Sequence, residues 1–124
     1  MLISIYNELH SRFGNQNWWP VTLENEIMPN HHKNIKLTEK QKLEICFGAI
    51  LTQNTNWKNV EKAIAQSNKN NLININGIIK ITNENLARII RSSGYHNQKA
   101  IKLKNFCLFL INNYDKNIEK LFSN

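Results

Sequence analysis

The chain has 124 residues, of which 41% are hydrophobic and 20% are charged, which fits one folded domain of modest size or part of one. Sixteen Lys and Arg residues against nine acidic residues give a formal net charge of +7, which favours a polyanionic partner, nucleic acid before an acidic membrane surface. No stretch approaches the roughly 18 to 20 apolar residues of a membrane span, and the amphipathic N-terminus lacks the pattern of a signal peptide, so we expect a cytoplasmic protein.

The first third of the chain predicts a helix followed by irregular backbone. Apolar residues at helical spacing predict a helix over residues 2–13, which Gly14 ends. Residues 14–37 contain Trp18-Trp19-Pro20 and then a polar loop with His31-His32. The tryptophans can simply cover the core, since their side chains bury a large area. The His pair is interpreted as solvated, because no third metal ligand is evident nearby.

A capping box at Thr38-x-x-Gln41 predicts that the next helix begins at Glu39. Its apolar face ends at Leu51, and a run of short polar side chains occupies residues 52–56. Asn and Thr favour turns and helix N-caps, so this run predicts a turn before a helix that begins near Trp57. The turn is either an ordinary connection or a platform that presents side chains to a partner.

The remaining pattern is also helical. We expect a loop at residues 66–71, a helix within 72–81 with a strand as the weaker alternative, and a helix capped by Thr82. That helix should end at Ser92-Ser93-Gly94 with Gly94 in the left-handed region. Asn97 is expected to cap the last long helix. Apolar residues at positions 118, 121 and 122 predict a final turn or short helix. Cys46 and Cys107 fall in apolar helical patterns and are interpreted as core residues. The sequence thus predicts an all-α fold with one domain over residues 1–124, its main helices within 38–123.

Three strings resemble the endonuclease III-like DNA glycosylases of the helix-hairpin-helix (HhH-GPD) base-excision repair superfamily. They are LTQNTNWKNVEKA from Leu51, Asn17-Trp18-Trp19-Pro20, and the segment 90–100, IRSSGYHNQKA. The last two are similar to the alkylbase-glycosylase branch. The resemblance spans about residues 5–115, with the strings in the family's order.

The resemblance implies roles for individual residues. Gln53 matches the wedge that enters the gap left by an extruded base, and Trp57 matches a wall of the base pocket. The rest of the implied pocket is Trp18, Trp19 and Pro20. Further candidates for DNA contact are Thr52, Asn54, Lys58 and Lys99. The pool of cations for phosphate contacts is Lys58, Lys62, Arg88, Arg91, Lys99, Lys102 and Lys104, although a solvated surface role is the plainer interpretation of any one of them.

The family's Leu-Pro-Gly-x-Gly-type hairpin and the catalytic aspartate that follows it have no counterpart here. Asp115 is the only aspartate, and it does not stand in the catalytic context, so we assign no catalytic residue and no metal ligand. No cofactor is expected in this chain, because the cysteines of a family iron–sulfur cluster would lie further on. We expect the N-terminal part of a glycosylase, truncated or half of a split enzyme, with uncovered apolar surface.

The predicted function is base-excision repair on double-stranded DNA that carries a damaged base, with an alkylated base as the leading candidate. Whether the chain is itself an enzyme is left open, because the family comprises DNA N-glycosylases, some with lyase activity, whereas the catalytic aspartate region is missing here. A C-terminal partner chain is one way to complete the site. The alternative is a non-enzymatic, basic all-α module that binds DNA or a protein, and a third interpretation is a structural fragment without a function of its own.

Overall fold

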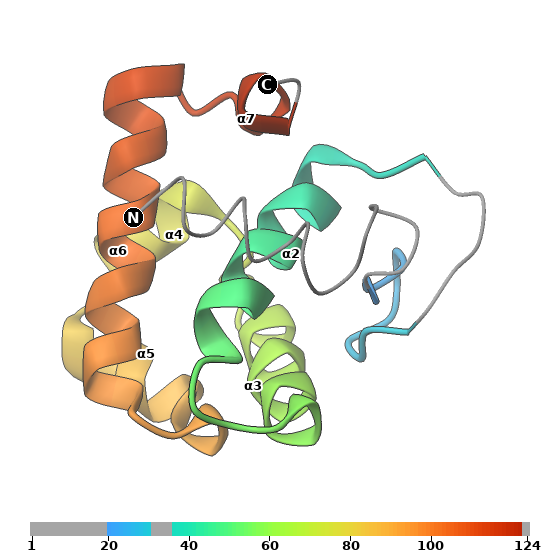
Figure 1. Ribbon diagram of the computed structural model, residues 1–124, viewed down its shortest axis with the longest axis vertical. Helices are drawn as coiled ribbons and strands as arrows, with labels where there is room; N and C mark the ends of the chain where they lie inside the picture. The colour runs from blue at the N-terminus through green and yellow to red at the C-terminus, as the bar shows by residue number, and fades with distance from the viewer. Residues whose placement is uncertain (1–19, 31–35, 123–124) are drawn as a thin grey trace.

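The structure of the protein is a computed structural model that describes residues 20–30 and 36–122 (Figure 1). Its helices are α2 (Glu39–Leu51), α3 (Trp57–Lys69), α4 (Ile75–Lys80), α5 (Asn83–Ile89), the 3-10 helix η2 (Arg91–Ser93), α6 (His96–Tyr114) and α7 (Ile118–Phe122). In the described ranges, strand-like pairing is limited to one antiparallel bridge between Val21 and Asn30. The predicted all-α fold is therefore confirmed.

Some predicted features lie outside the described residues. They are the helix over residues 2–13, Trp18-Trp19 and His31-His32. Among the helices that are described, none combines the length and the apolar character that a membrane crossing requires.

Helix α6 runs along one side of the molecule, and α2, α4 and α5 all contact it (Figure 1). The rings of Phe47 in α2 and Phe106 in α6 meet edge to face inside the core, with centroids 6.4 Å apart. Helix α7 returns to α2, where Glu119 forms an ion pair with Lys42. The C-terminal end of α2 and the N-terminal ends of α3 and α6 all lie at the lower end of the molecule in Figure 1.

Helix α2 is the central helix of the fold. The predicted capping box is confirmed, because the Thr38 hydroxyl accepts a bond from the Gln41 amide (3.1 Å) and the Gln41 side chain accepts one from the Thr38 amide (2.9 Å). Every residue from Leu43 to Leu51 is buried. A helix that is surrounded on all sides buries more than its apolar stripe, which is why Glu44 is covered as well.

The segment 66–71, predicted to be a loop, continues α3 as far as Lys69, so the prediction was wrong for most of this segment. Tertiary contacts explain the difference. The Asn68 side chain is buried and donates to Thr22 Oγ1 (3.2 Å) and to the Ile27 carbonyl (3.0 Å). The Ser67 hydroxyl donates back to the Ala63 carbonyl, which satisfies it inside the helix (2.8 Å).

The junction of η2 and α6 also differs from the prediction. Helix α6 begins at His96, so Asn97 is inside the first turn and is not the cap. The N-cap position belongs to Tyr95, which has left-handed backbone angles (φ 46°, ψ 39°) and no capping side-chain bond. Gly94 has positive φ as expected, but with ψ 162° it is extended and not in the left-handed helical region.

The predicted core positions of the cysteines are confirmed, since Cys46 and Cys107 are both buried and free. The surface of α6 exposes Ile101 (48%) and Leu108 (44%), which are seven positions apart and so lie on one face of the helix. The predicted helix within 72–81 is present but begins only at Ile75, capped by the side chain of Asn74. The short helix predicted at the end of the chain is α7.

Candidate nucleic-acid interface

The turn between α2 and α3 is a short structure fixed at both ends. The backbone amide of Thr52 caps α2, and the Asn56 side chain accepts a bond from the Asn59 amide (3.0 Å) at the start of α3. The Asn59 side chain donates to the Thr55 hydroxyl (3.1 Å), and Asn54 adopts positive φ (59°), which Asn tolerates better than most residues. The predicted turn is thus confirmed.

Gln53 projects from this turn beside α6. Its side-chain oxygen accepts a hydrogen bond from the ammonium group of Lys102 (2.8 Å), and both groups are solvent-accessible. Asn54, the next residue, is exposed. The structure therefore presents two of the predicted DNA-contact side chains at the surface, one of them held by a cation of α6.

A second segment, residues 91–95, lies next to the turn. The Ser92 hydroxyl donates to the Asn59 carbonyl near the start of α3 (3.1 Å). The segment ends in two successive residues with positive φ, Gly94 and Tyr95, and the Tyr95 side chain is 61% exposed. A bulky residue in the left-handed region is uncommon, and such strain concentrates at functional sites. No role is predicted for Tyr95 from the sequence, although Gly94 directly before a helix start marks the position.

The structure corrects two of the predicted DNA-contact residues, Thr52 and Lys99. Thr52 is only 5% exposed, because it lies against the end of α2. Lys99 is 2% exposed, and its ammonium group donates to the carbonyls of Leu51 and Ser93, each at 2.7 Å. Burial and the nearby charge of Lys102 lower the pKa of Lys99. Both side chains are thus buried and not exposed at the surface.

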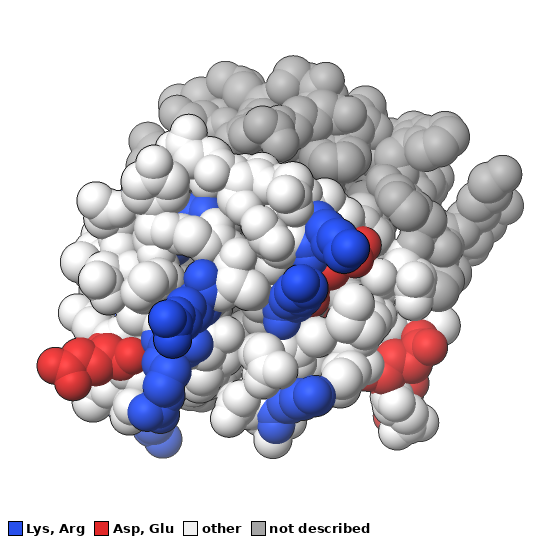
Figure 2. Space-filling model, turned by 90° about the horizontal axis from the view of Figure 1, so that it is seen from below, with Lys and Arg blue, Asp and Glu red and all other residues white. Residues whose placement is uncertain are grey.

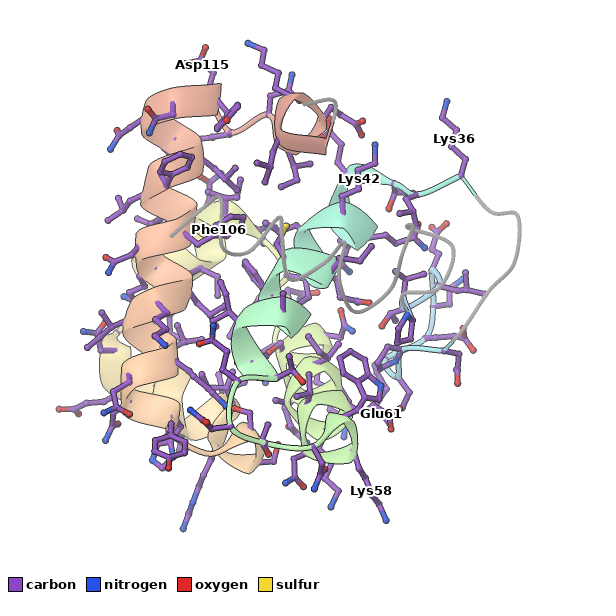
Figure 3. The ribbon with its side chains drawn as sticks, in the orientation of Figure 1. Lys36, Lys42, Lys58, Glu61, Phe106 and Asp115 are labelled. Carbon is purple, nitrogen blue, oxygen red and sulfur yellow. The ribbon has the colours of Figure 1, made fainter. Side chains whose placement is uncertain are left out.

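We call the surface made of the turn 52–56, the segment 91–95 and the first turns of α3 and α6 the lower face. Figure 2 views the molecule from this side, and Lys and Arg side chains are spread over it, with acidic side chains mainly toward the edges. Lys58 points away from the first turn of α3 at this end (Figure 3). The first turns of α3 and α6 contain no acidic residue, so the positive ends of both helix dipoles add to the field there. Of the cations predicted as candidates for phosphate contact, those that are exposed are Lys58, Lys62, Arg88, Arg91 and Lys102.

Trp57 and Pro20 are the described members of the predicted pocket. Trp57, the first residue of α3, is partly buried and packs against the hydrophobic core. Pro20 is buried, and the segment that follows it is fixed to α2, because the Thr22 amide donates to the Glu44 carboxylate (2.8 Å) and the Gln41 side chain donates to the Thr22 carbonyl (3.2 Å). Trp18 and Trp19 lie outside the described residues.

Cys46 and Cys107 lie buried among apolar side chains of the core. Burial raises the pKa of Cys107 to about 12, and burial together with the neighbouring Cys107 raises the pKa of Cys46. In the part of the chain that the structure describes, His, Cys, Asp and Glu side chains form no group of three or more that could hold a metal ion.

Comparison with known proteins identifies the family. The sequence profile described as "HhH-GPD superfamily base excision DNA repair protein" matches residues 47–122. The chain belongs to the HhH-GPD superfamily of base excision DNA repair proteins. The match includes α2 from Phe47 onward, the turn 52–56, Trp57, the segment 91–95 and α6.

One curated relative of this HhH-GPD chain is the protein named "Putative DNA repair glycosylase" from Methanocaldococcus jannaschii. The two sequences are 36% identical over 114 residues, which is 92% of the present chain and 44% of the relative. The chain thus spans less than half the length of that relative. No solved structure matches the chain significantly.

Proposed function

We propose that this HhH-GPD chain binds double-stranded DNA through its lower face and holds a damaged base extruded from the duplex during base excision repair. The observation that carries the proposal is the placement of Gln53 and Tyr95. They stand on two adjacent loops that Lys99 and Ser92 tie to neighbouring elements, on a surface rich in exposed cations. Cations on such a surface neutralise phosphates, which supplies the sequence-independent part of DNA affinity.

The wedge role of Gln53 agrees with its chemistry and position. Extrusion of a base costs a few kcal/mol of stacking and pairing, and the vacated space must be filled. An amide can donate to and accept from the orphaned partner base. When Gln53 enters the duplex, it gives up its bond to Lys102, whose exposed ammonium group has further donors and can contact a phosphate with or without that bond. The exposed ring of Tyr95 suits insertion at a neighbouring base step, as aromatic and apolar wedges do in other DNA-bending proteins.

The proposed base pocket comprises Trp57 together with Pro20, Trp18 and Trp19. Stacking of a base on an aromatic ring is worth roughly 1 to 3 kcal/mol. A cationic alkylated purine gains a further cation–π attraction of about 0.5 to 2 kcal/mol over a neutral base. Aromatic walls therefore favour alkylated bases, which is the substrate class that we propose.

In this proposal the described residues recognise the damaged base but do not cleave its glycosidic bond. Asp115 lies at the opposite end of the molecule from Lys58 (Figure 3), and the Glu44 carboxylate is buried and bonded to the Thr22 amide. Cleavage of the glycosidic bond would use a carboxylate from a further segment or a partner chain. Any iron–sulfur cluster would likewise be bound by residues other than Cys46 and Cys107.

The test compares three duplexes of one sequence: undamaged, with an abasic site, and with an alkylated purine. We expect the chain to prefer both damaged duplexes. Gln53→Ala should weaken binding to both by about tenfold, because no side chain then fills the vacated space in the duplex. A tenfold loss of affinity corresponds to about 1.4 kcal/mol. Trp57→Leu should weaken binding to the alkylated duplex only, because an abasic site offers no base to stack. Affinities would be measured by fluorescence anisotropy at one fixed salt concentration.

Asn113→Ala is the matched control for Gln53→Ala, since Asn113 is an exposed amide near the C-terminal end of α6, far from the lower face. Thermal unfolding of each variant checks that the core around Trp57 is intact. Equal affinity of the unchanged chain for all three duplexes would contradict the proposed function and favour a non-enzymatic DNA-binding module.

A further inference from the structure

Lys99 is a buried cation that the proposed DNA contacts do not use. Its side chain is 2% exposed, and its ammonium group donates to two backbone carbonyls at 2.7 Å. A buried charge is costly unless it is hydrogen-bonded, so these bonds are required and not incidental. The acceptors belong to separate elements, since Leu51 is the last residue of α2 and Ser93 is the last residue of η2.

Both carbonyls lie at the base of a loop of the lower face. Leu51 precedes Gln53 by two positions, and Ser93 precedes Tyr95 by two positions. A single ammonium group therefore sets the separation of the two backbone points from which the proposed wedge side chains project. The last carbonyls of a helix also lack partners within the helix, so Lys99 supplies the capping donor that α2 needs at its C-terminal end.

The other hydrogen bonds of the two loops connect different pairs of elements. Ser92 joins η2 to α3, and Asn59 joins the turn to α3. Lys102, three positions after Lys99 on α6, reaches the side chain of Gln53 but not the backbone of the turn. Of the bonds found for the described residues, those of Lys99 alone connect the end of α2 with η2 through one atom.

We infer that Lys99 is a positioning residue that holds Gln53 and Tyr95 at the fixed separation needed to open a DNA duplex at a damaged site. This inference rests on the proposed function, but the residue does not touch DNA. Loss of its ammonium group should therefore leave the phosphate contacts intact and remove only the preference for damaged DNA. The alternative is that Lys99 only stabilises the fold, in which case its loss should affect all helices and not the two loops alone.

The test uses Lys99→Met, which keeps the length of the side chain and removes its donors, with Lys102→Met as the matched control on the same helix. We expect K99M to bind undamaged duplex as the unchanged chain does, with the same dependence on salt, and to lose about tenfold in its preference for the abasic duplex. K102M should instead weaken binding to every duplex and lower the salt slope by about 1, as the loss of one phosphate contact does.

Amide hydrogen exchange provides a measurement without DNA. In K99M the amides of residues 52–56 and 93–95 should exchange at least about tenfold faster, while those of α4 keep their rate. Uniform acceleration in all helices, or unchanged exchange in both loops of a folded K99M, would overturn the inference. Suppose that exchange accelerates only in the two loops of K99M while the unchanged chain shows no preference for damaged DNA. In that case Lys99 still connects the two loops, and only the proposed function is contradicted.

Discussion

At the scale of single residues, one lysine and one glutamate of the described part of the chain are buried. Lys99 is one, and Glu44 is the other. Burial raises the pKa of Glu44, and this effect outweighs the hydrogen bonds from Thr22 and Asn68 and the charge of Lys40, which act in the opposite direction. The carboxylate fixes the segment after Pro20 to α2, so its protonation state bears on the wall of the proposed pocket.

The raised pKa of Glu44 predicts how stability depends on pH. The folded state binds the Glu44 proton more tightly than the unfolded state, whose pKa is near 4.5. The contribution of this group to stability is therefore fully present below about pH 4.5 and is lost as the pH rises through the folded-state pKa. Glu44→Gln keeps an oxygen acceptor but cannot ionise. We expect the stability of E44Q relative to the unchanged chain to increase from about pH 4 to about pH 7 in urea unfolding.

Glu84→Gln, at an exposed position of α5, controls for the removal of a negative charge from the protein as a whole. A difference between E44Q and the unchanged chain that stays constant with pH would show that Glu44 does not titrate differently in the two states.

At the scale of elements, the join between η2 and α6 is the most unusual piece of backbone. Gly94 has φ 71° and ψ 162°, a conformation that is essentially confined to glycine, and Tyr95 follows in the left-handed region. The two residues turn the chain sharply enough for α6 to begin at His96 without a side-chain cap. This turn also exposes the Tyr95 ring on the lower face.

Gly94→Ala should destabilise the protein by about 1 to 3 kcal/mol, the typical cost of a disfavoured backbone conformation. The cost must come from the backbone, because a methyl group at Gly94 would meet no atom within 4 Å. Chemical denaturation of the variant measures the free energy of unfolding.

Gly77→Ala is the matched control for this substitution. Gly77 is inside α4, where alanine is the better helix former and the added methyl group would approach the Asn71 carbonyl only to 3.4 Å. That substitution should be neutral or stabilising. Equal losses of stability at the two glycines would contradict the assigned backbone strain.

At the scale of the whole molecule, the net charge is +7, but the effect of each positive charge on DNA binding should depend on where it lies. Cations at the lower face add to the positive ends of α3 and α6, whereas other lysines are far from them. Figure 3 shows Lys58 at the lower end and Lys36 on the segment before α2, away from that end. Equal charges at the two positions should thus affect DNA binding differently.

Lys58→Ala should lower the slope of log affinity against log salt by about 1 for undamaged duplex, since one phosphate contact is removed. Lys36→Ala removes the same charge from an exposed position elsewhere and should leave the slope unchanged. Binding at several salt concentrations measures both slopes. Equal changes in the two variants would show that DNA responds to net charge and not to the lower face.

The sequence alone determined the features that depend on a few neighbouring residues. The capping box at Thr38, the polar turn 52–56 and the cap at Thr82 are formed as predicted, because their donors and acceptors lie within three or four positions of each other. The family, too, was evident from short strings around the turn and the start of α6.

Only the tertiary structure decided which side chains of those strings are exposed. Lys99 bonds to a carbonyl 48 positions away, and Asn68 extends α3 because its side chain meets a segment more than 40 positions earlier. No local pattern predicts contacts between residues so far apart in the sequence. The residues around a helical lysine do not differ according to whether its side chain faces solvent or the end of a neighbouring helix. Tyr95 gained its exposed place on the lower face for the same reason. The packing of α2, α3 and α6 selects which of these polar residues can reach a partner.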